Sequence, residues 1–139
     1  MKILIINGPN LNMLGKREPD IYGSQTLEQI NVEIAAFAAK KGVSVEFFHS
    51  NSEGGIIDRL HAAAGQFDGV ILNAGAYTHY SYAIADAISS AGLPCVEVHM
   101  SNVHAREEFR HNSVLAKNCR GVICGFGVKS YILALEALA

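Results

Sequence analysis

Short apolar runs alternate with amphipathic stretches along the whole chain. Five segments are rich in apolar and β-branched residues, as is typical of strands covered on both faces of a parallel sheet. They are residues 3–6, 43–48, 69–72, 94–99 and 121–124. Between them, apolar residues recur at the spacing of an amphipathic helix. The pattern therefore predicts strands that alternate with helices.

Three of the connecting stretches carry helix start or stop signals. Thr26 is followed three residues later by Gln29, which matches a capping box, and Gly42 supplies a stop after the apolar repeat. Ser52 can cap a second helix, and a third is expected over about residues 81–91. The pattern thus predicts one helix in each of the connections that follow the first, second and third strands.

Two further stretches have helical composition, residues 106–110 and 128–138. Strands that alternate with helices predict an α/β fold whose right-handed crossovers cover both faces of a parallel sheet. For five strands, a flavodoxin-like three-layer sandwich with strand order 2-1-3-4-5 is the natural expectation. With 139 residues and no repeat or linker, the chain is expected to form a single domain over residues 1–139.

Composition and charge remove several classes of function. A net charge of −2 gives no electrostatic reason to expect nucleic acid or an anionic membrane surface. The apolar runs are far shorter than the ~20 residues that span a bilayer, and the first residues lack the organisation of a signal peptide. The three cysteines, an odd number without metal-ligand spacing, are expected to be reduced. The chain is thus expected to be cytoplasmic.

The connection after the first strand, residues 7–25, is unusually long. A strand-to-helix connection commonly takes about 2–6 residues, and longer ones in compact domains are often lids or binding loops. This connection carries a cation, several amides and a phenol, which favours a binding loop. The alternative is a solvated insertion without a role.

Polar residues follow several strands of the predicted sheet. Asn7 and Asn10 follow the first strand, residues 73–79 follow the third, and residues 99–102 follow the fourth. Open α/β sheets bind ligands at the carboxyl ends of their strands. A single asparagine at such a place could merely cap a turn, but the repetition on several strands predicts a site.

The common cofactor motifs are not satisfied. A phosphate-binding P-loop ending at Gly15-Lys16 would need glycine where Asn10 stands and Ser or Thr where Arg17 stands. Gly125-Phe126-Gly127 lacks the third glycine of a dinucleotide fingerprint. The histidines form no His-Glu-x-x-His pair. No cofactor and no metal are therefore expected.

Glu97 and His99 are the most informative pair in the sequence. Residues two apart on a strand share one face, so the carboxylate can reach one ring nitrogen and leave the other for a ligand. Such a partner fixes the tautomer and favours the protonated imidazole, which would make His99 a proton donor. The alternative is a core histidine satisfied by a neighbouring acid.

Tyr22 and Arg17 form a second candidate pair. A phenol titrates near 10 and is a poor base at neutral pH, but an adjacent guanidinium stabilises the phenolate. The alternative is a packed tyrosine and a solvated arginine. Arg106 and Arg110 lie four residues apart and would share one face if their segment is helical, where one or both could bind an anionic or hydroxylated ligand.

The chain resembles type II 3-dehydroquinate dehydratases almost from end to end. The resemblance rests on the combined order of several motifs: Ile6-Asn7-Gly8-Pro9-Asn10-Leu11, Arg17-Glu18-Pro19, Tyr22-Gly23, Asn51-Ser52-Glu53-Gly54, Asn73-Ala74-Gly75-Ala76, Thr78-His79, and the run from Glu97 to Arg110. Met100 and Tyr80 depart from the residues common in the family at these positions.

The resemblance implies a reversible anti elimination of water from 3-dehydroquinate, which gives 3-dehydroshikimate through an enol or enolate. In the family, this reaction belongs to the shikimate pathway or to quinate catabolism and needs neither metal nor cofactor. The resemblance implies that Tyr22 abstracts the proton next to the ketone while Arg17 holds Tyr22 ionised. It further implies that Asn10 positions a water at the enolate oxygen, and that His99, oriented by Glu97, protonates the departing hydroxyl.

The resemblance also implies a set of binding residues and an assembly. Asn73, His79 and Arg110 would bind substrate hydroxyls, and Met100 and Ser101 would form the carboxylate site. Asp86 would reach the substrate of a neighbouring subunit in a homododecamer built as a tetramer of trimers. Two rival functions stay open from the residues alone: a non-enzymatic flavodoxin-like binding module and a metal hydrolase that uses the histidines.

Overall fold

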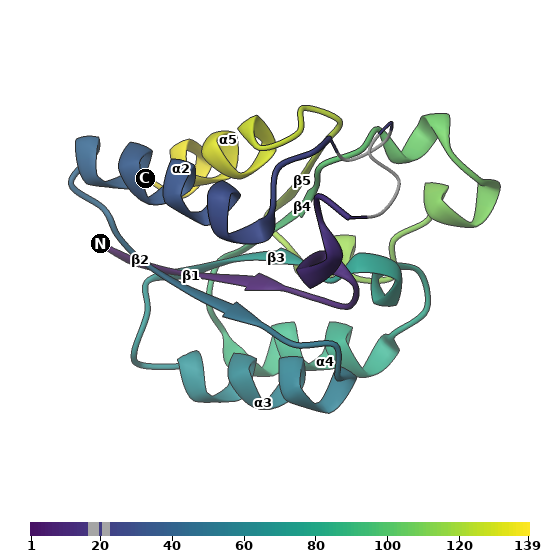
Figure 1. The fold of residues 1–139 in the computed structure, drawn as a ribbon. Helices are drawn as coiled ribbons and strands as arrows, with labels where there is room; N and C mark the ends of the chain where they lie inside the picture. The colour runs from purple at the N-terminus through teal and green to yellow at the C-terminus, as the bar shows by residue number, and fades with distance from the viewer. Residues whose placement is uncertain (17–19, 21–22) are drawn as a thin grey trace.

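A parallel sheet of five strands forms the centre of the computed structural model, which describes residues 1–16, 20 and 23–139. The strands are β1 (Lys2–Asn7), β2 (Ser44–His49), β3 (Gly69–Asn73), β4 (Cys95–His99) and β5 (Gly121–Cys124). Their order across the sheet is β2-β1-β3-β4-β5, and every neighbouring pair is parallel (Figure 1). The predicted α/β fold and strand order are confirmed.

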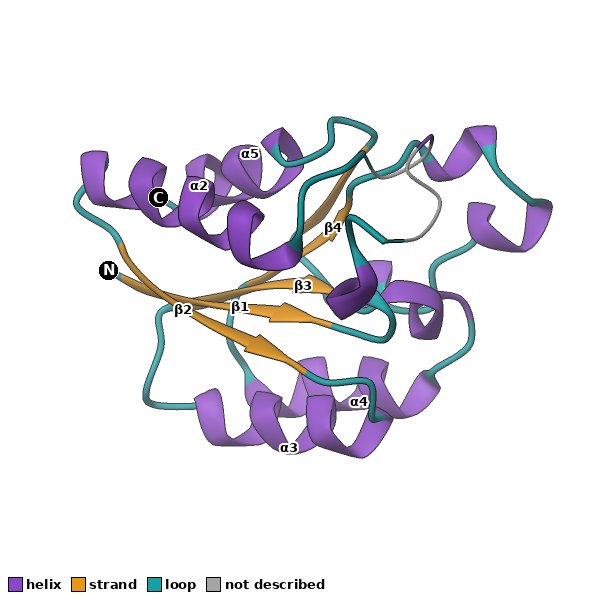
Figure 2. Ribbon diagram, viewed as in Figure 1, coloured by secondary structure: helices purple, strands orange, loops and turns teal. Residues whose placement is uncertain are grey.

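Four longer helices cover the two faces of this sheet. They are α2 (Leu27–Lys40), α3 (Glu53–Ala63), α4 (Tyr82–Ala91) and α5 (Lys129–Leu138). Figure 2 shows α2 and α5 above the sheet and α3 and α4 below it, which gives the three layers expected from the sequence. Among the described residues, no helix is long and apolar enough to cross a membrane.

Alternate residues of the strands supply two separate cores. Ile3 and Ile5 of β1 are buried against the layer of α2 and α5, whereas Leu4 and Ile6 are buried against the layer of α3 and α4. All four side chains are at most 1% exposed. Because burial of each such side chain contributes about 1.5–3 kcal/mol, the central strand is fixed in register from both sides.

The helix starts have the predicted capping geometry. Thr26 Oγ1 accepts a hydrogen bond from the Gln29 amide at 3.2 Å, and Gln29 Oε1 accepts one from the Thr26 amide at 2.9 Å. Ser52 Oγ accepts from the amide of Gly55 at 3.1 Å at the start of α3. At the start of α2, the backbone amides of Thr26 and Gln29 thereby gain the hydrogen-bond partners that they would otherwise lack.

The segment between β4 and β5 differs from the prediction. The helix expected over residues 106–110 is absent, and two short 3-10 turns, η3 (Val103–Ala105) and η4 (Glu108–His111), stand there instead. Arg106 between them has extended backbone angles, φ −114° and ψ −166°. A five-residue helix gains too few hydrogen bonds to offset its nucleation cost, so capping and tertiary contacts decide the local backbone.

Two of the cysteines lie close together under β4. Cys119 Sγ is 3.9 Å from Cys95 Sγ, and Cys95 is buried. This contact and the burial raise the pKa of the Cys95 thiol well above its usual value. Cys95 therefore remains a neutral thiol at neutral pH and is a poor nucleophile.

Candidate active site

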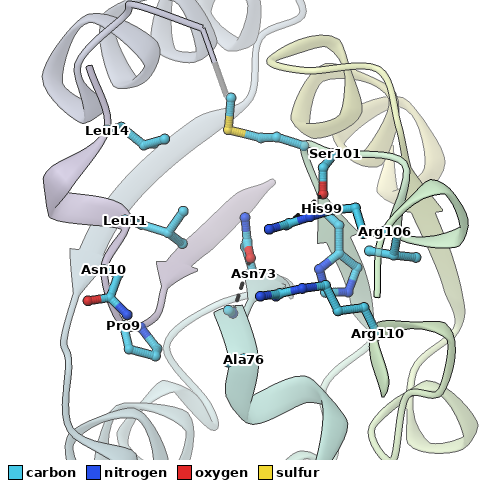
Figure 3. A pocket seen from close by; sticks show the side chains of 13 residues that line it. Pro9, Asn10, Leu11, Leu14, Asn73, Ala76, His99, Ser101, Arg106 and Arg110 are labelled. Carbon is cyan, nitrogen blue, oxygen red and sulfur yellow. Dashed lines mark hydrogen bonds between the residues drawn. The ribbon is translucent and has the colours of Figure 1, made fainter. Parts of the chain in front are cut away.

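A cavity opens at the carboxyl ends of the central strands. It lies at the edge of the sheet where ligands of open α/β folds bind. The described residues that line it come from the segments after β1, β3 and β4: Pro9, Asn10, Leu11, Leu14, Asn73, Gly75, Ala76, His99, Met100, Ser101, Val103, Arg106 and Arg110. Residues far apart in the sequence thus meet in one place (Figure 3).

His99 and Glu97 form a buried hydrogen-bonded pair below the cavity. His99 Nε2 lies 2.6 Å from Glu97 Oε2, and the two residues are 7% and 1% exposed. They share a face of β4 because they are two residues apart on the strand. The contact predicted from the sequence is therefore present.

The carboxylate determines which nitrogen of His99 can meet a ligand. An ionised carboxylate only accepts hydrogen bonds, so the Nε2 atom of His99 must carry a proton toward Glu97. The Nδ1 atom is then the ring nitrogen that can meet a ligand, and His99 lines the cavity. A second hydrogen bond runs from the Ser113 hydroxyl to Glu97 Oε1 at 2.6 Å, so each oxygen of this buried acid has a partner.

His79 lies beside His99 on the short 3-10 turn η2 (Gly75–His79). The two imidazoles are stacked with ring centroids 6.2 Å apart and planes inclined by 18°. His79 Nδ1 is 2.8 Å from the carbonyl oxygen of Asn112, and since a carbonyl only accepts, Nδ1 carries the proton. In the neutral ring, Nε2 is then a free acceptor for a hydroxyl.

Burial lowers the pKa of His79 below its ordinary value, and the neighbouring His99 and Arg110 add to this effect. The hydrogen bond to Asn112 and the charge of Glu97 act in the opposite direction but do not outweigh burial. His79 is thus held neutral at physiological pH. A neutral imidazole suits the recognition of a hydroxyl group.

Two arginines make one wall of the cavity positive. Figure 3 shows the side chains of Arg106 and Arg110 extending toward the centre of the cavity. The Arg106 Nη1 atom donates to Ser101 Oγ at 3.3 Å, and Arg110 Nε donates to Glu107 Oε1 at 3.0 Å. Because guanidinium groups are cationic and match the geometry of carboxylates, this wall favours an anionic ligand.

The opposite wall comes from the connection after β1 and is mostly apolar. Pro9, Leu11 and Leu14 lie there, with Asn10 at the edge (Figure 3). Asn10 has a left-handed backbone, φ 72°, and its amide donates to Asn51 Oδ1 at 2.9 Å. Asparagine tolerates this conformation better than most residues, and the bond to Asn51 holds it in place.

A glycine allows the ends of β1 and β3 to meet closely. The Gly8 amide donates to the carbonyl of Asn73 at 2.7 Å. A Cβ atom at Gly8 would lie 2.8 Å from the backbone of Ala74, which is too close for any side chain. This contact brings the two segments that line the floor of the cavity together.

A buried polar network supports the floor of the cavity from below. The Tyr131 hydroxyl of α5 donates to Asn7 Oδ1 at 2.6 Å and accepts from Asn73 Nδ2 at 2.9 Å. Asn73 Oδ1 accepts from the Gly75 amide at 3.2 Å, which leaves the second amide hydrogen of Asn73 for a ligand. Burial raises the pKa of Tyr131 above its ordinary value, so this phenol stays neutral.

The structure brings most of the predicted site residues to this cavity. Asn10, Asn73, His99, Met100, Ser101 and Arg110 line it, and Glu97 and His79 contact His99 directly or through ring stacking. Asp86 lies elsewhere, on the exposed side of α4. Arg17 and Tyr22 are outside the described residues, so their predicted roles stay predictions.

Three contributors to the site were not assigned their observed contacts from the sequence. Arg106 and Arg110 were predicted as candidate ligand-binding residues on one helical face; that helix is not formed, yet both line the cavity. Ser113 and Asn51 act behind the cavity by holding Glu97 and Asn10. Among the described residues, no cluster of three or more His, Cys, Asp or Glu side chains could hold a metal ion.

Comparisons with known proteins agree with one another. A family model described as "Dehydroquinase class II" matches residues 1–139. A 3-dehydroquinate dehydratase of Caldicellulosiruptor bescii is 59% identical over 138 residues, which are 99% of this chain and 95% of that protein. A second, from Geotalea daltonii, is 56% identical over 138 residues, 99% of this chain and 96% of that protein. The crystal structure of a type II dehydroquinase from Butyrivibrio crossotus matches with a TM-score of 0.97 and 51% identity, and the match covers 99% of this chain and 97% of that one.

Proposed function

The chain belongs to the class II dehydroquinase family, and from this membership we propose that it dehydrates 3-dehydroquinate to 3-dehydroshikimate in the shikimate pathway. The observation that carries the proposal is the buried Glu97–His99 pair at the edge of the cavity. Elimination of a hydroxyl group needs a proton donor at the leaving oxygen, and this pair is suited to provide one.

His99 acts as the general acid. A proton on Nδ1 would pass to the hydroxyl group as its bond to carbon breaks, so that water and not hydroxide departs. Glu97 stabilises the protonated ring through Nε2 and fixes its orientation. Since Glu97 is 1% exposed, little water competes for this interaction.

The base is Tyr22, held as phenolate by Arg17. It takes the proton from the carbon next to the ketone, and the electron pair moves into the enolate. When the enolate collapses, the double bond forms and the hydroxyl leaves toward His99. Asn10, beside the cavity on the connection after β1, positions a water at the enolate oxygen.

The remaining residues recognise the ring and its carboxylate. Three side chains bind the hydroxyl groups: Asn73 through an amide hydrogen, His79 through a ring nitrogen and Arg110 through its guanidinium. Met100 and Ser101, at the end of β4, form the carboxylate site next to Arg106. The positive wall supports this assignment because 3-dehydroquinate is an anion.

The reaction changes no oxidation state of the substrate as a whole, so it calls for no redox cofactor. Two rival functions remain testable. A flavin-binding module would purify with a chromophore and would not turn over dehydroquinate. A metal hydrolase would lose its activity with a chelator, whereas the elimination through His99 and Tyr22 would not.

We further propose that the enzyme assembles as a cytoplasmic homododecamer, a tetramer of trimers, in which Asp86 reaches the cavity of a neighbouring subunit. Asp86 is exposed on α4, beside Tyr82, which is 71% exposed. On β5 and just after it, Val122 and Phe126 are 44% and 62% exposed. Large apolar side chains left open at the surface support burial between subunits.

Turnover of 3-dehydroquinate tests the function directly. The product absorbs in the ultraviolet, so wild-type protein should produce a rising absorbance without added metal or cofactor. Tyr22→Phe removes only the hydroxyl that takes the proton and should abolish the signal while the protein still folds. Absence of turnover by the wild-type protein would refute the proposed function. Substantial turnover by Tyr22→Phe would assign the base to another residue, with His79 next to be tested.

Sedimentation of the active enzyme tests the assembly. The expected mass is roughly twelve times the 14.9 kDa chain mass. Asp86→Ala should weaken substrate binding without changing this mass. A fully active monomer would contradict both the assembly and the shared site.

A further inference from the structure

The hydroxyl of Ser113 contacts the acid that lies behind His99. Ser113 follows η4 and precedes η5 (Ala116–Asn118), on the segment that leads from Arg110 to β5. Its Oγ atom is 2.6 Å from Glu97 Oε1, while His99 Nε2 is 2.6 Å from Glu97 Oε2. The two carboxylate oxygens thus have separate partners, one on each side.

The direction of the bond between Ser113 and Glu97 follows from the other bonds of the hydroxyl. Ser113 Oγ accepts from the amides of Leu115 at 3.1 Å and Ala116 at 3.0 Å. These two amides occupy both acceptor positions of the hydroxyl oxygen. Its single hydrogen is therefore donated to Glu97.

We propose that Ser113 is a positioning residue for the dehydration, which aligns the Glu97 carboxylate and through it the imidazole of His99. The proposal rests on the proposed function, in which His99 is the general acid. A carboxylate held by one donor can rotate about its last torsion, which is broad and soft. A second donor on the other oxygen limits this rotation and keeps Oε2 in line with Nε2.

The same segment also fixes the second histidine. The Asn112 carbonyl accepts from His79 Nδ1 at 2.8 Å, and the Val114 amide donates to the Thr78 carbonyl at 2.9 Å. Residues 112–114 therefore hold His79 by backbone bonds and His99 through Ser113 and Glu97. A shift of this segment would move both imidazoles relative to each other.

A purely structural role for Ser113 makes a different prediction. If the hydroxyl served only to cap the turn at Leu115 and Ala116, its loss would lower stability and leave the chemistry unchanged. Ser52 provides a matched control, because its Oγ also accepts from a backbone amide three residues later, that of Gly55. No hydrogen bond from the Ser52 hydroxyl to a carboxylate is found among the described residues.

Steady-state kinetics of Ser113→Ala, Ser113→Thr and Ser52→Ala separate the two roles. Ser113→Ala should lower kcat by about 10- to 100-fold with KM nearly unchanged, the range for outer partners that orient a functional histidine. Ser113→Thr keeps the hydroxyl and should restore most of kcat. Ser52→Ala should lower the melting temperature but not kcat. A kcat of Ser113→Ala equal to that of the wild type would overturn the proposal.

NMR spectra of the His99 ring provide a measurement that does not depend on turnover. In the wild type, the proton on Nε2 should appear as a sharp downfield resonance, because a carboxylate holds it. Ser113→Ala should broaden or shift this resonance, and Ser113→Thr should restore it. An unchanged resonance in Ser113→Ala would overturn the alignment role even if the wild type failed to act on dehydroquinate.

A further variant covers the case in which Ser113→Ala does not fold. Ser113→Cys has nearly the same shape but a weak S–H donor. Its kcat and the chemical shift of its Nε2 proton should lie between those of Ser113→Thr and Ser113→Ala. If Ser113→Ala does not fold, Ser113→Cys should still have a clearly lower kcat and a different Nε2 proton shift than Ser113→Thr. Equality of the cysteine and threonine variants in both measurements would show that the donor strength does not matter and would refute the proposal.

Discussion

The two stacked histidines, His99 in the cavity lining and His79 beside it, are held in opposite ways. His99 stands on β4 among buried strands and binds a carboxylate at 2.6 Å, whereas His79 stands on a 3-10 turn and binds a backbone carbonyl at 2.8 Å. The Glu97 carboxylate accepts a hydrogen bond from His99 Nε2, while burial lowers the pKa of His79. Identical side chains 6.2 Å apart thus acquire different chemistry from their supports.

This difference assigns one histidine to proton transfer and the other to recognition. A donor needs a partner that stabilises its charged form, and Glu97 is such a partner for His99. A hydroxyl-binding group needs a fixed lone pair, which the neutral ring of His79 has on Nε2. Substitutions at the two positions should therefore change different kinetic constants.

The largest effect is expected for His99→Ala. Loss of the general acid should lower kcat by about 10²–10⁴-fold, the usual contribution of such a group, with a small change in KM. Steady-state turnover of dehydroquinate measures both constants, and the melting temperature controls for misfolding. A variant with a nearly normal kcat would end the distinction between the two histidines.

Glu97→Gln should have a smaller effect of about 10- to 100-fold on kcat. The neutral amide no longer requires a proton on Nε2, because its NH₂ can donate to Nε2 and its oxygen can accept from it, so the tautomer that Glu97 fixes is lost. The imidazole remains but is poorly oriented. Steady-state turnover of dehydroquinate measures this effect. A loss of kcat larger than that of His99→Ala would show that Glu97 does more than orient the ring.

His79→Asn should mainly raise KM. Loss of one hydrogen bond of about 0.5–1.5 kcal/mol corresponds to a roughly 2- to 13-fold weaker interaction with substrate. The effect on kcat should be smaller than that on KM. If instead kcat falls as far as in His99→Ala, His79 takes part in proton transfer, and the assignment of different roles to the two histidines is wrong.

The smallest effect concerns the pH dependence of stability. Because the folded protein holds the pKa of His79 below its ordinary 6.5, the unfolded chain binds this proton more readily. The contribution of His79 to stability is therefore complete above pH 6.5 and declines as the pH falls through the folded-state pKa. Denaturant unfolding of wild type and His79→Asn over this range should show the difference. A difference that stayed constant with pH would contradict the lowered pKa.

The fold was largely predictable because its signals are local and periodic. Apolar runs marked the strands, and the capping box at Thr26 marked the start of α2 to the residue. The contact between Glu97 and His99 followed from the two-residue period of a strand. The order of the strands came from a general preference of five-stranded α/β folds and not from a residue.

The parts of the site that were missed depend on irregular backbone. Both arginines after β4 line the cavity as candidate ligand-binding residues, but the helix expected to carry them was wrong, because the chain forms short turns with an extended Arg106 between them. Ser113 meets Glu97 across 16 residues through a hydroxyl in a loop, and no periodicity marks such a contact. Asn51 likewise reaches Asn10 across 41 residues. Only the folded chain brings these partners together.

The hydrogen bond from Tyr131 to Asn7 has a consequence for the order of folding. These residues are 124 positions apart, so the bond closes a loop of almost the entire chain. Asn7 and Asn73, at the ends of β1 and β3, therefore gain their shared buried partner only when α5 docks. During synthesis, the sheet could begin to pair while the floor of the cavity still lacks its support. The floor of the cavity should thus be completed late, after the helix that carries Tyr131 has left the ribosome.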